Sequence, residues 1–480
     1  MRGDVTFGHN GLDDQSRSMT INSCLVIAVL FVAAYVGLHD PSGTYLEHAQ
    51  MAVCVLLICV LAFTLLNRIV KDRLLELSNL IFVIFFILRI PFVYGDVVIS
   101  DVYLRASEIG KVPSSLYILA YQYVVLSLCL FVVRPIAPSV SFQPLTNTEA
   151  SRILKFSGVI LAANVFYLLT SFKIGEDNLP NVLAIARALF NYSSVLFLLA
   201  PCLFLFDEKI FRKYRLLLYL ELVVVAVCIL FTGSKSGILQ IFLFYLLALV
   251  VIRGPSYVIS LRSTFVIAAL LLVAIAFFFG GIALNQYQRN QIALVDVSST
   301  IQLLMADTNA ATAALSYRIG YLDFFIDKLN NAAYAGSFSL MAYAKAFIDA
   351  VTPGFDVYGQ ALVSRAVFVD AFGASGGPNS EAITVFAEAH RFAGYASFVI
   401  YLPVLLIIRV TARMLRSVSG FDRVLVGMFV VYSFQQYLVG FGLDYWLFAS
   451  VVYPMIFLAV SSSYLGAAGA ANRAFTTVTR

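Results

Sequence analysis

The sequence is poor in charged residues and contains a single tryptophan. Only 12% of its 480 residues are Asp, Glu, Lys or Arg, whereas 61% are hydrophobic. A soluble domain normally has about 25% charged residues, because polar side chains must cover its surface. This composition excludes an ordinary soluble protein and indicates an integral membrane protein.

Several common functional motifs are also missing from the sequence. Neither the Walker glycine motif nor the dinucleotide-binding glycine motif occurs, which disfavours an ATP-driven pump. No repeat of a fixed solenoid period is visible. The cysteines have no metal-like spacing and fall within apolar stretches, so we interpret them as packing residues without a disulfide framework. These cysteines are Cys24, Cys54, Cys59, Cys129, Cys202 and Cys228.

Apolar stretches recur along nearly the whole chain. Each is about 17–23 residues long, which is enough for a helix to cross the roughly 30 Å hydrocarbon core of a bilayer. The predicted fold class is an all-α polytopic membrane protein with about 12 transmembrane helices. The expected spans are 21–37, 48–66, 75–94, 114–133, 153–172, 184–206, 214–231, 236–252, 263–284, 393–412, 424–440 and 444–463.

These spans divide the chain into five parts. The N-terminal stretch lacks a clear small-residue cleavage site, so we interpret the first apolar stretch as a retained span. The parts are a tail at 1–20, nine spans within 21–284, a long polar segment at 285–392, three spans within 393–463 and a tail at 464–480.

Most Lys and Arg residues gather in connections on one side of this arrangement. Examples are the clusters at 68–73, 209–215 and 409–423. The positive-inside rule assigns this side to the cytoplasm, so both termini are predicted to be cytoplasmic and the 285–392 segment lies outside. Long polar segments of this kind usually carry function.

Two amphipathic helices are expected within this outer segment. In the first, apolar residues recur every three or four positions, at Leu315, Ile319, Leu322, Ile326 and Leu329. The second is expected at about 338–349, with Leu340, Tyr343, Phe347 and Ile348 on one face. The apolar part of each helix is too short to cross a membrane. We therefore expect both helices to lie on the outer surface or to cap the bundle.

Several basic residues lie on the outer side, where the topology rule predicts few. A charge at the depth of the bilayer is costly unless it pairs, faces a cavity or extends to the interface. Extension to the interface or pairing with a helix explains any single one of them equally well. As a set, however, they suit the oxygens of a lipid-linked phosphate or pyrophosphate. The set is Arg89, Arg187, Lys235, Arg289, Arg318, Arg365 and Arg391.

Residues 379–392 concentrate chemically active side chains just before a late span. Glu388 and Arg391 are three positions apart and share a helix face, while His390 points to another side of the same turn. Of the four histidines, His390 is the one beside a carboxylate and an arginine. An imidazole suits proton transfer near neutral pH, although an ordinary helix end would explain the same residues.

Polar residues also occur inside expected spans. The segment 121–123 reads Tyr-Gln-Tyr, and Asn164, Asn191 and the segment 432–437 are further examples. Aromatic rings and amides suit the faces and hydroxyls of sugars, so these residues could line a hydrated sugar-binding groove. Hydrogen bonds between helices are the alternative explanation for them.

Three short motifs resemble those of the bacterial O-antigen polymerase (Wzy-like) family of oligosaccharide repeat-unit polymerases. Residues 232–237, Thr-Gly-Ser-Lys-Ser-Gly, are similar to its Ser-Arg/Lys-Ser segment. Residues 317–323, which run on to Pro353, are similar to its Arg-containing outer segment. Residues 378–394, with Glu388, resemble its Glu…Phe-Gly start of a late span.

The resemblance covers about 230–410 and the overall topology. The chain departs from the family where it has Gly354, since a second arginine is often found there. It also departs near His390 and Arg391, where a Tyr or Asn is more usual. The related O-antigen ligases place an outer-face histidine near the same late span.

The resemblance implies a metal-independent membrane glycosyltransferase of the GT-C kind, without a cofactor, in the bacterial inner membrane. It would transfer a glycan from undecaprenyl pyrophosphate onto another lipid-linked repeat unit at the periplasmic face. Glu388 or His390 would deprotonate the acceptor hydroxyl, and this choice stays open. Pyrophosphate charge would be stabilised by Arg187, Lys235, Arg289, Arg318 and Arg391, with Arg89, Arg365 and Tyr317 as secondary candidates.

The partners implied by the resemblance are the undecaprenyl-pyrophosphate-linked donor and acceptor glycans and membrane lipids, with a polysaccharide chain-length regulator as a candidate protein partner. No nucleic acid is expected. One alternative function is an O-antigen ligase, which joins the polymer to the lipid A core. Another is a transporter or flippase of lipid-linked oligosaccharide, which the long outer segment and the lack of visible inverted repeats disfavour.

Overall fold

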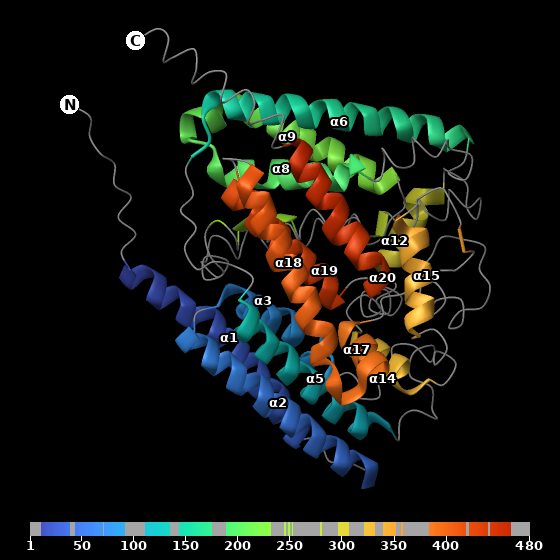
Figure 1. Cartoon of the computed structure of the whole chain (residues 1–480). Coiled ribbons are helices and arrows are strands. Elements are labelled where there is room, and N and C mark those ends of the chain that lie inside the picture. The colour runs from blue at the N-terminus through green and yellow to red at the C-terminus, as the bar shows by residue number, and fades with distance from the viewer. Residues whose placement is uncertain are drawn as a thin grey trace.

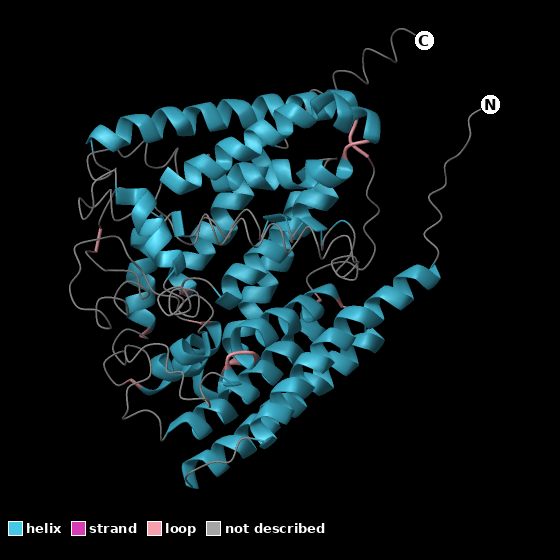
Figure 2. Cartoon of the chain, turned by 180° about the vertical axis from the view of Figure 1, so that it is seen from behind, coloured by secondary structure: helices cyan, strands magenta, loops and turns pink. Residues whose placement is uncertain are grey.

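The computed structural model is helical through almost all of the residues that it describes, and it contains no β-strand within them. One isolated bridge joins Leu145 to Phe206. The described residues are 11–38, 44–70, 72–91, 111–134, 144–174, 189–231, 244–245, 248–249, 252, 279–280, 296–306, 321–331, 339–351, 357–358, 384–418, 422–439 and 442–461. Figures 1 and 2 show their helices gathered in one bundle.

The first part of the chain forms one side of this bundle (Figure 1). Its elements are α1 (Gly11–Leu38), α2 (Thr44–Val70), α3 (Arg73–Phe82), the π-helical turn η1 (Val83–Ile87) and α5 (Val112–Val133). Helix α2 packs between α1 and α5. Helix α3 begins after Asp72, whose carboxylate accepts hydrogen bonds from the backbone amides of Leu74 and Leu75 at 2.8 and 3.1 Å.

A second group of helices covers the opposite end, where α6 lies across the bundle (Figure 1). The group consists of α6 (Asn147–Ile174), α8 (Tyr192–Leu205) and α9 (Glu208–Phe231), which pack on one another. Helix α6 begins with a capping box, because Thr146 and Glu149 each accept a backbone hydrogen bond from the other.

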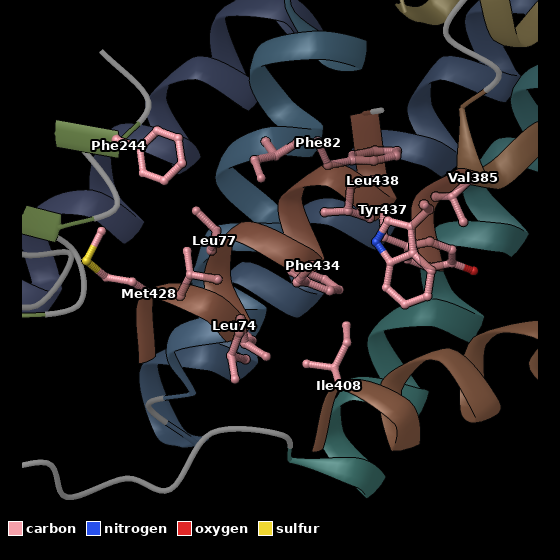
Figure 3. Packing of buried hydrophobic residues seen from close by; sticks show 14 of the residues in the cluster. Leu74, Leu77, Phe82, Phe244, Val385, Ile408, Met428, Phe434, Tyr437 and Leu438 are labelled. Atoms are coloured by element: carbon pink, nitrogen blue, oxygen red, sulfur yellow. The ribbon is translucent and has the colours of Figure 1, made fainter. Parts of the chain in front are cut away.

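The C-terminal helices cross the middle of the bundle and connect the two groups (Figure 1). They are α18 (Phe398–Val418), α19 (Asp422–Val439), α20 (Leu443–Trp446) and the π-helical η8 (Leu447–Val452). Figure 3 shows Phe434, Tyr437 and Leu438 of α19 close to side chains of other helices. The Trp446 indole donates a hydrogen bond of 2.7 Å to the Ser433 carbonyl, which fixes α20 against α19.

Three described helices are long and apolar enough to cross a membrane, namely those at His48–Asn67, Val112–Val133 and Asn147–Leu169. Their length and composition indicate a membrane protein, which is helical through the described part of the chain. Shorter apolar helices coincide with other expected spans, at Leu25–Leu38, Leu74–Ile87, Tyr192–Leu205, Leu425–Leu438 and Ala449–Ser461. The full set of about 12 spans stays a prediction, and the expected spans 236–252 and 263–284 fall mostly outside the described residues.

The predicted outer segment contributes short helices beside this bundle. They are α12 (Val297–Ala306), α14 (Tyr321–Asn330), α15 (Leu340–Val351) and α17 (Val385–Ala393), and the 3-10 turn η7 (Gly394–Ala396) follows α17 at the start of the expected span 393–412. Helix α15 confirms the helix expected at 338–349, although its Leu340 is exposed and does not share the buried environment of Tyr343.

The first amphipathic helix was expected to lie on the outer surface or to cap the bundle, and its described part, α14, differs from the first of these places, because it packs against η1, α5 and α17. All residues from Leu322 to Lys328 are buried, on every side of the helix. The charged residues explain the difference, because they pair inside the protein and need no contact with water. Lys328 binds Asp327 at 2.8 Å, and both side chains are almost fully buried.

An ion pair links α14 to the N-terminal helices. Arg89, which follows η1, contacts Asp323 through two nitrogen–oxygen pairs of 3.3 and 2.6 Å. The Arg89 side chain is 2% exposed and that of Asp323 is 11% exposed. Burial raises the pKa of the Asp323 carboxyl, and the guanidinium opposes that rise. The pair therefore specifies where α14 docks.

We predict that Asp323→Ala destabilises the folded protein by about 3–5 kcal/mol, because it leaves Arg89 buried without its carboxylate. The double variant Arg89→Met/Asp323→Leu should recover most of this loss, since two apolar side chains remove both charges. Unfolding in detergent micelles measures both variants. A double variant no more stable than Asp323→Ala would contradict the importance of this pair.

Candidate functional site

Helix α17 carries the three described residues of the predicted site, Glu388, His390 and Arg391. It begins after Thr384, whose φ of 57° is unfavourable for a β-branched residue, and ends at Gly394, whose φ of 56° suits glycine. Phe386 anchors the helix, because its ring meets Phe82 and Phe86 edge-on at centroid distances of 5.5 and 5.4 Å.

Glu388 is buried, with 4% of its surface exposed. Its Oε1 atom accepts a hydrogen bond from the Tyr343 hydroxyl on α15 and another, of 2.8 Å, from the Leu443 backbone amide at the start of α20. Both donors favour the ionised carboxylate. Glu388 thus joins three helices that are far apart in the sequence.

His390 is half-buried and lies against α5. Its Nδ1 atom is 3.3 Å from Nε2 of Gln122, a fully buried residue. The same Gln122 nitrogen donates to the Gly394 carbonyl at 3.3 Å, and its Oε1 accepts from the Tyr401 hydroxyl at 2.7 Å. Burial lowers the pKa of His390, and the positive charge of Arg391 lowers it further. Both effects favour the neutral imidazole.

Arg391 binds the C-terminal end of α14. Its Nε donates to the Lys328 carbonyl at 2.9 Å, and Nη2 donates to the Asn331 carbonyl. The last carbonyls of a helix have no partner within the helix, so a guanidinium there satisfies them and complements the helix dipole. This role is structural, in addition to the charge that the predicted phosphate site requires.

The secondary candidate Arg89 does not join this group, because it is bound to Asp323 on another side of α14. The remaining predicted residues lie outside the described part of the chain. They are Arg187, Lys235, Arg289, Arg318, Arg365 and Tyr317.

Several residues that hold the site were not found from the sequence. In the sequence, Gln122 and Tyr343 are only polar or apolar positions on expected helices, Asp323 is the last residue of the 317–323 motif, and no pattern marks Asp327 or Tyr401. One signal for these residues is present in the sequence. Charged residues at 323, 327 and 328 lie among the apolar residues of α14, and buried charges of this kind need partners.

Metal binding finds no support in the described ranges, where no group of three or more His, Cys, Asp and Glu side chains is placed to hold an ion. A metal-independent reaction nevertheless stays a prediction. Comparison with known protein families, curated proteins and solved structures gives no match for this chain. The described residues thus form a helical bundle, with helices apolar enough to span a membrane and a buried polar site between α5, α14, α15, α17 and α20.

We predict that Tyr343→Phe destabilises the protein by about 1.5–3 kcal/mol, because it removes a hydrogen bond to the buried Glu388 carboxylate. Tyr219→Phe is the matched control, since the Tyr219 side chain is half exposed on α9. It should change the free energy of unfolding by less than about 0.5 kcal/mol. Equilibrium unfolding in mixed micelles measures the free energy of unfolding of both variants. Equal effects of the two substitutions would contradict the prediction.

Proposed function

We propose that this chain is a membrane glycosyltransferase that polymerises undecaprenyl-pyrophosphate-linked oligosaccharide repeat units. The reaction would take place at the periplasmic face of a bacterial inner membrane. One observation carries the proposal: α17 holds a carboxylate, an imidazole and a guanidinium within four residues, beside helices that are apolar enough to span a bilayer. A lipid-linked sugar phosphate needs this combination of an apolar environment and polar groups.

The reaction has simple chemical requirements. The acceptor hydroxyl oxygen forms a bond to the anomeric carbon of the donor sugar while the bond from that carbon to the pyrophosphate oxygen breaks. The bonding electrons leave with the pyrophosphate, and the hydroxyl proton passes to a base. Glu388 or His390 supplies the base, and cationic groups stabilise the leaving pyrophosphate. In this proposal Arg187, Lys235, Arg289 and Arg318 provide most of that positive charge.

Arg391 has a modified role in this proposal. Two of its nitrogens already donate to carbonyls at the end of α14, so they hold the outer segment in place. Its charge still lies beside His390 and lowers the pKa of that residue. Arg391 therefore acts on the phosphate through its charge and through the position of α14.

Exposed aromatic rings beside His390 support a glycan substrate. Tyr395 is 67% exposed, and its ring meets the His390 ring edge-on at 5.6 Å. Tyr121 donates a hydrogen bond to the Tyr395 carbonyl, and the two tyrosine rings also meet edge-on, at 5.2 Å. Aromatic faces next to hydrogen-bonding groups suit the apolar faces and hydroxyls of sugar rings.

The catalytic prediction concerns polymer length. Alanine at Glu388 or at His390 should abolish long glycan chains in at least one of the two variants, because one of these residues accepts the hydroxyl proton. Protein level is checked by immunoblot, and surface polysaccharide is resolved as a ladder on a gel. The controls are Glu208→Ala and His48→Ala, which change exposed side chains on other helices. Full-length polymer from both site variants would refute the proposed base.

Loss of the whole protein separates the proposed function from its alternatives. A strain without it should show a lipid core that bears a single repeat unit, since ligation would continue without polymerisation. A bare core would indicate a ligase instead. Purified protein in liposomes gives a further test, because movement of a lipid-linked sugar between leaflets without elongation would indicate a flippase.

A further inference from the structure

We infer that Gln122 fixes His390 in the tautomer that carries its proton on Nε2, so that His390 donates a hydrogen bond to an anionic phosphate oxygen of the substrate. The nature of this ligand rests on the proposed function. The tautomer itself rests on the geometry around Gln122.

The orientation of the Gln122 amide follows from its neighbours. The Gly394 carbonyl can only accept a hydrogen bond, so the Gln122 atom 3.3 Å from it must be the amide nitrogen. The Tyr401 hydroxyl, at 2.7 Å, then donates to the Gln122 oxygen. Gln122 and Tyr401 are both fully buried, so no water competes with these contacts.

This orientation decides which His390 nitrogen has the proton. The Gln122 amide nitrogen carries only donor hydrogens, so Nδ1 of His390, at 3.3 Å, must present its lone pair. A neutral imidazole then carries its proton on Nε2, and a doubly protonated ring would place two donors against each other. The lowered pKa of His390, caused by burial and by Arg391, agrees with a neutral ring.

The assigned tautomer changes the division of roles at the site. Among the described residues, Nε2 of His390 has no hydrogen-bond partner, and the residue is partly exposed. A nitrogen that already carries a proton cannot accept another, so Nε2 acts as a donor to the leaving pyrophosphate and not as the base. Glu388 is then the group that takes the acceptor proton.

The test is nuclear magnetic resonance of the full-length protein in lipid nanodiscs with ¹⁵N-labelled histidine. The chain has four histidines, and a His390→Gln sample identifies the His390 signals by difference. We expect Nε2 in the protonated range and Nδ1 in the unprotonated range, with titration below the ordinary pKa of 6.5. A proton on Nδ1 in the wild-type protein would overturn the inference.

Substitution of Gln122 gives a second readout. Gln122→Glu replaces the donor with an acceptor, so the proton should move to Nδ1 and the pKa of His390 should rise above its ordinary value. Gln302→Glu, at an exposed position on α12, is the matched control and should leave the His390 signals unchanged. Unchanged signals in the Gln122→Glu protein would also overturn the inference.

The ligand is tested with two probes, inorganic pyrophosphate and undecaprenyl pyrophosphate incorporated into the nanodiscs. If the anion reaches the site from the membrane, both probes should shift the Nε2–H signal. The lipid should do so at a lower concentration than inorganic pyrophosphate. A response to inorganic pyrophosphate alone would indicate a free anion as ligand and overturn the lipid assignment. No response to either would overturn the donor role. Failure of the polymer assay with these shifts intact would instead reject the proposed function alone.

Discussion

The cost of burying charge is the constraint on which the arrangement of this protein depends. Helix α14 brings Asp323, Asp327 and Lys328 into the interior, where an unpaired charge costs several kcal/mol. Asp323 must therefore meet Arg89, and Lys328 must meet Asp327. The Arg89–Asp323 pair ties this segment of the predicted outer region to the N-terminal helices, and Arg391 binds the end of the same helix. The position of α17 follows from these contacts.

The packing of these helices sets the geometry of the site. Its polar side chains come from α5, α15, α17 and α18, and each one is oriented by a group from another helix. Tyr343 and the Leu443 amide hold Glu388, while Gln122 holds His390. Buried hydrogen bonds of this kind are costly to leave unmade, so they define one arrangement of the side chains. A site built in this way presents its groups to a substrate without first reorganising.

Sequence patterns predicted the positions of the helices well, but they predicted the contacts between helices less well. The apolar stretches placed α2, α5 and α6 close to their observed positions, because hydropathy and length are local properties. The periodicity of 315–329 also indicated a helix, which the structure describes at 321–330, yet it left open whether that helix lies on the surface or caps the bundle. Periodicity reports only that one face is apolar. It cannot show that the polar face finds ionic partners hundreds of residues away, as Asp323 finds Arg89.

Composition and local spacing are enough to indicate a helical membrane protein and to place Glu388, His390 and Arg391 together on one turn of a helix. These conclusions depend on composition and on the spacing of residues within a few helical turns, and both can be read from a short segment of sequence. The surroundings of these three residues became known only from the packing of the helices. Glu388 is buried against Tyr343, Arg391 binds the end of α14, and Gln122 sets the protonated nitrogen of His390. Those roles depend on contacts between helices. Helix packing brings the contacting residues together, and the sequence around each residue carries no sign of its partner.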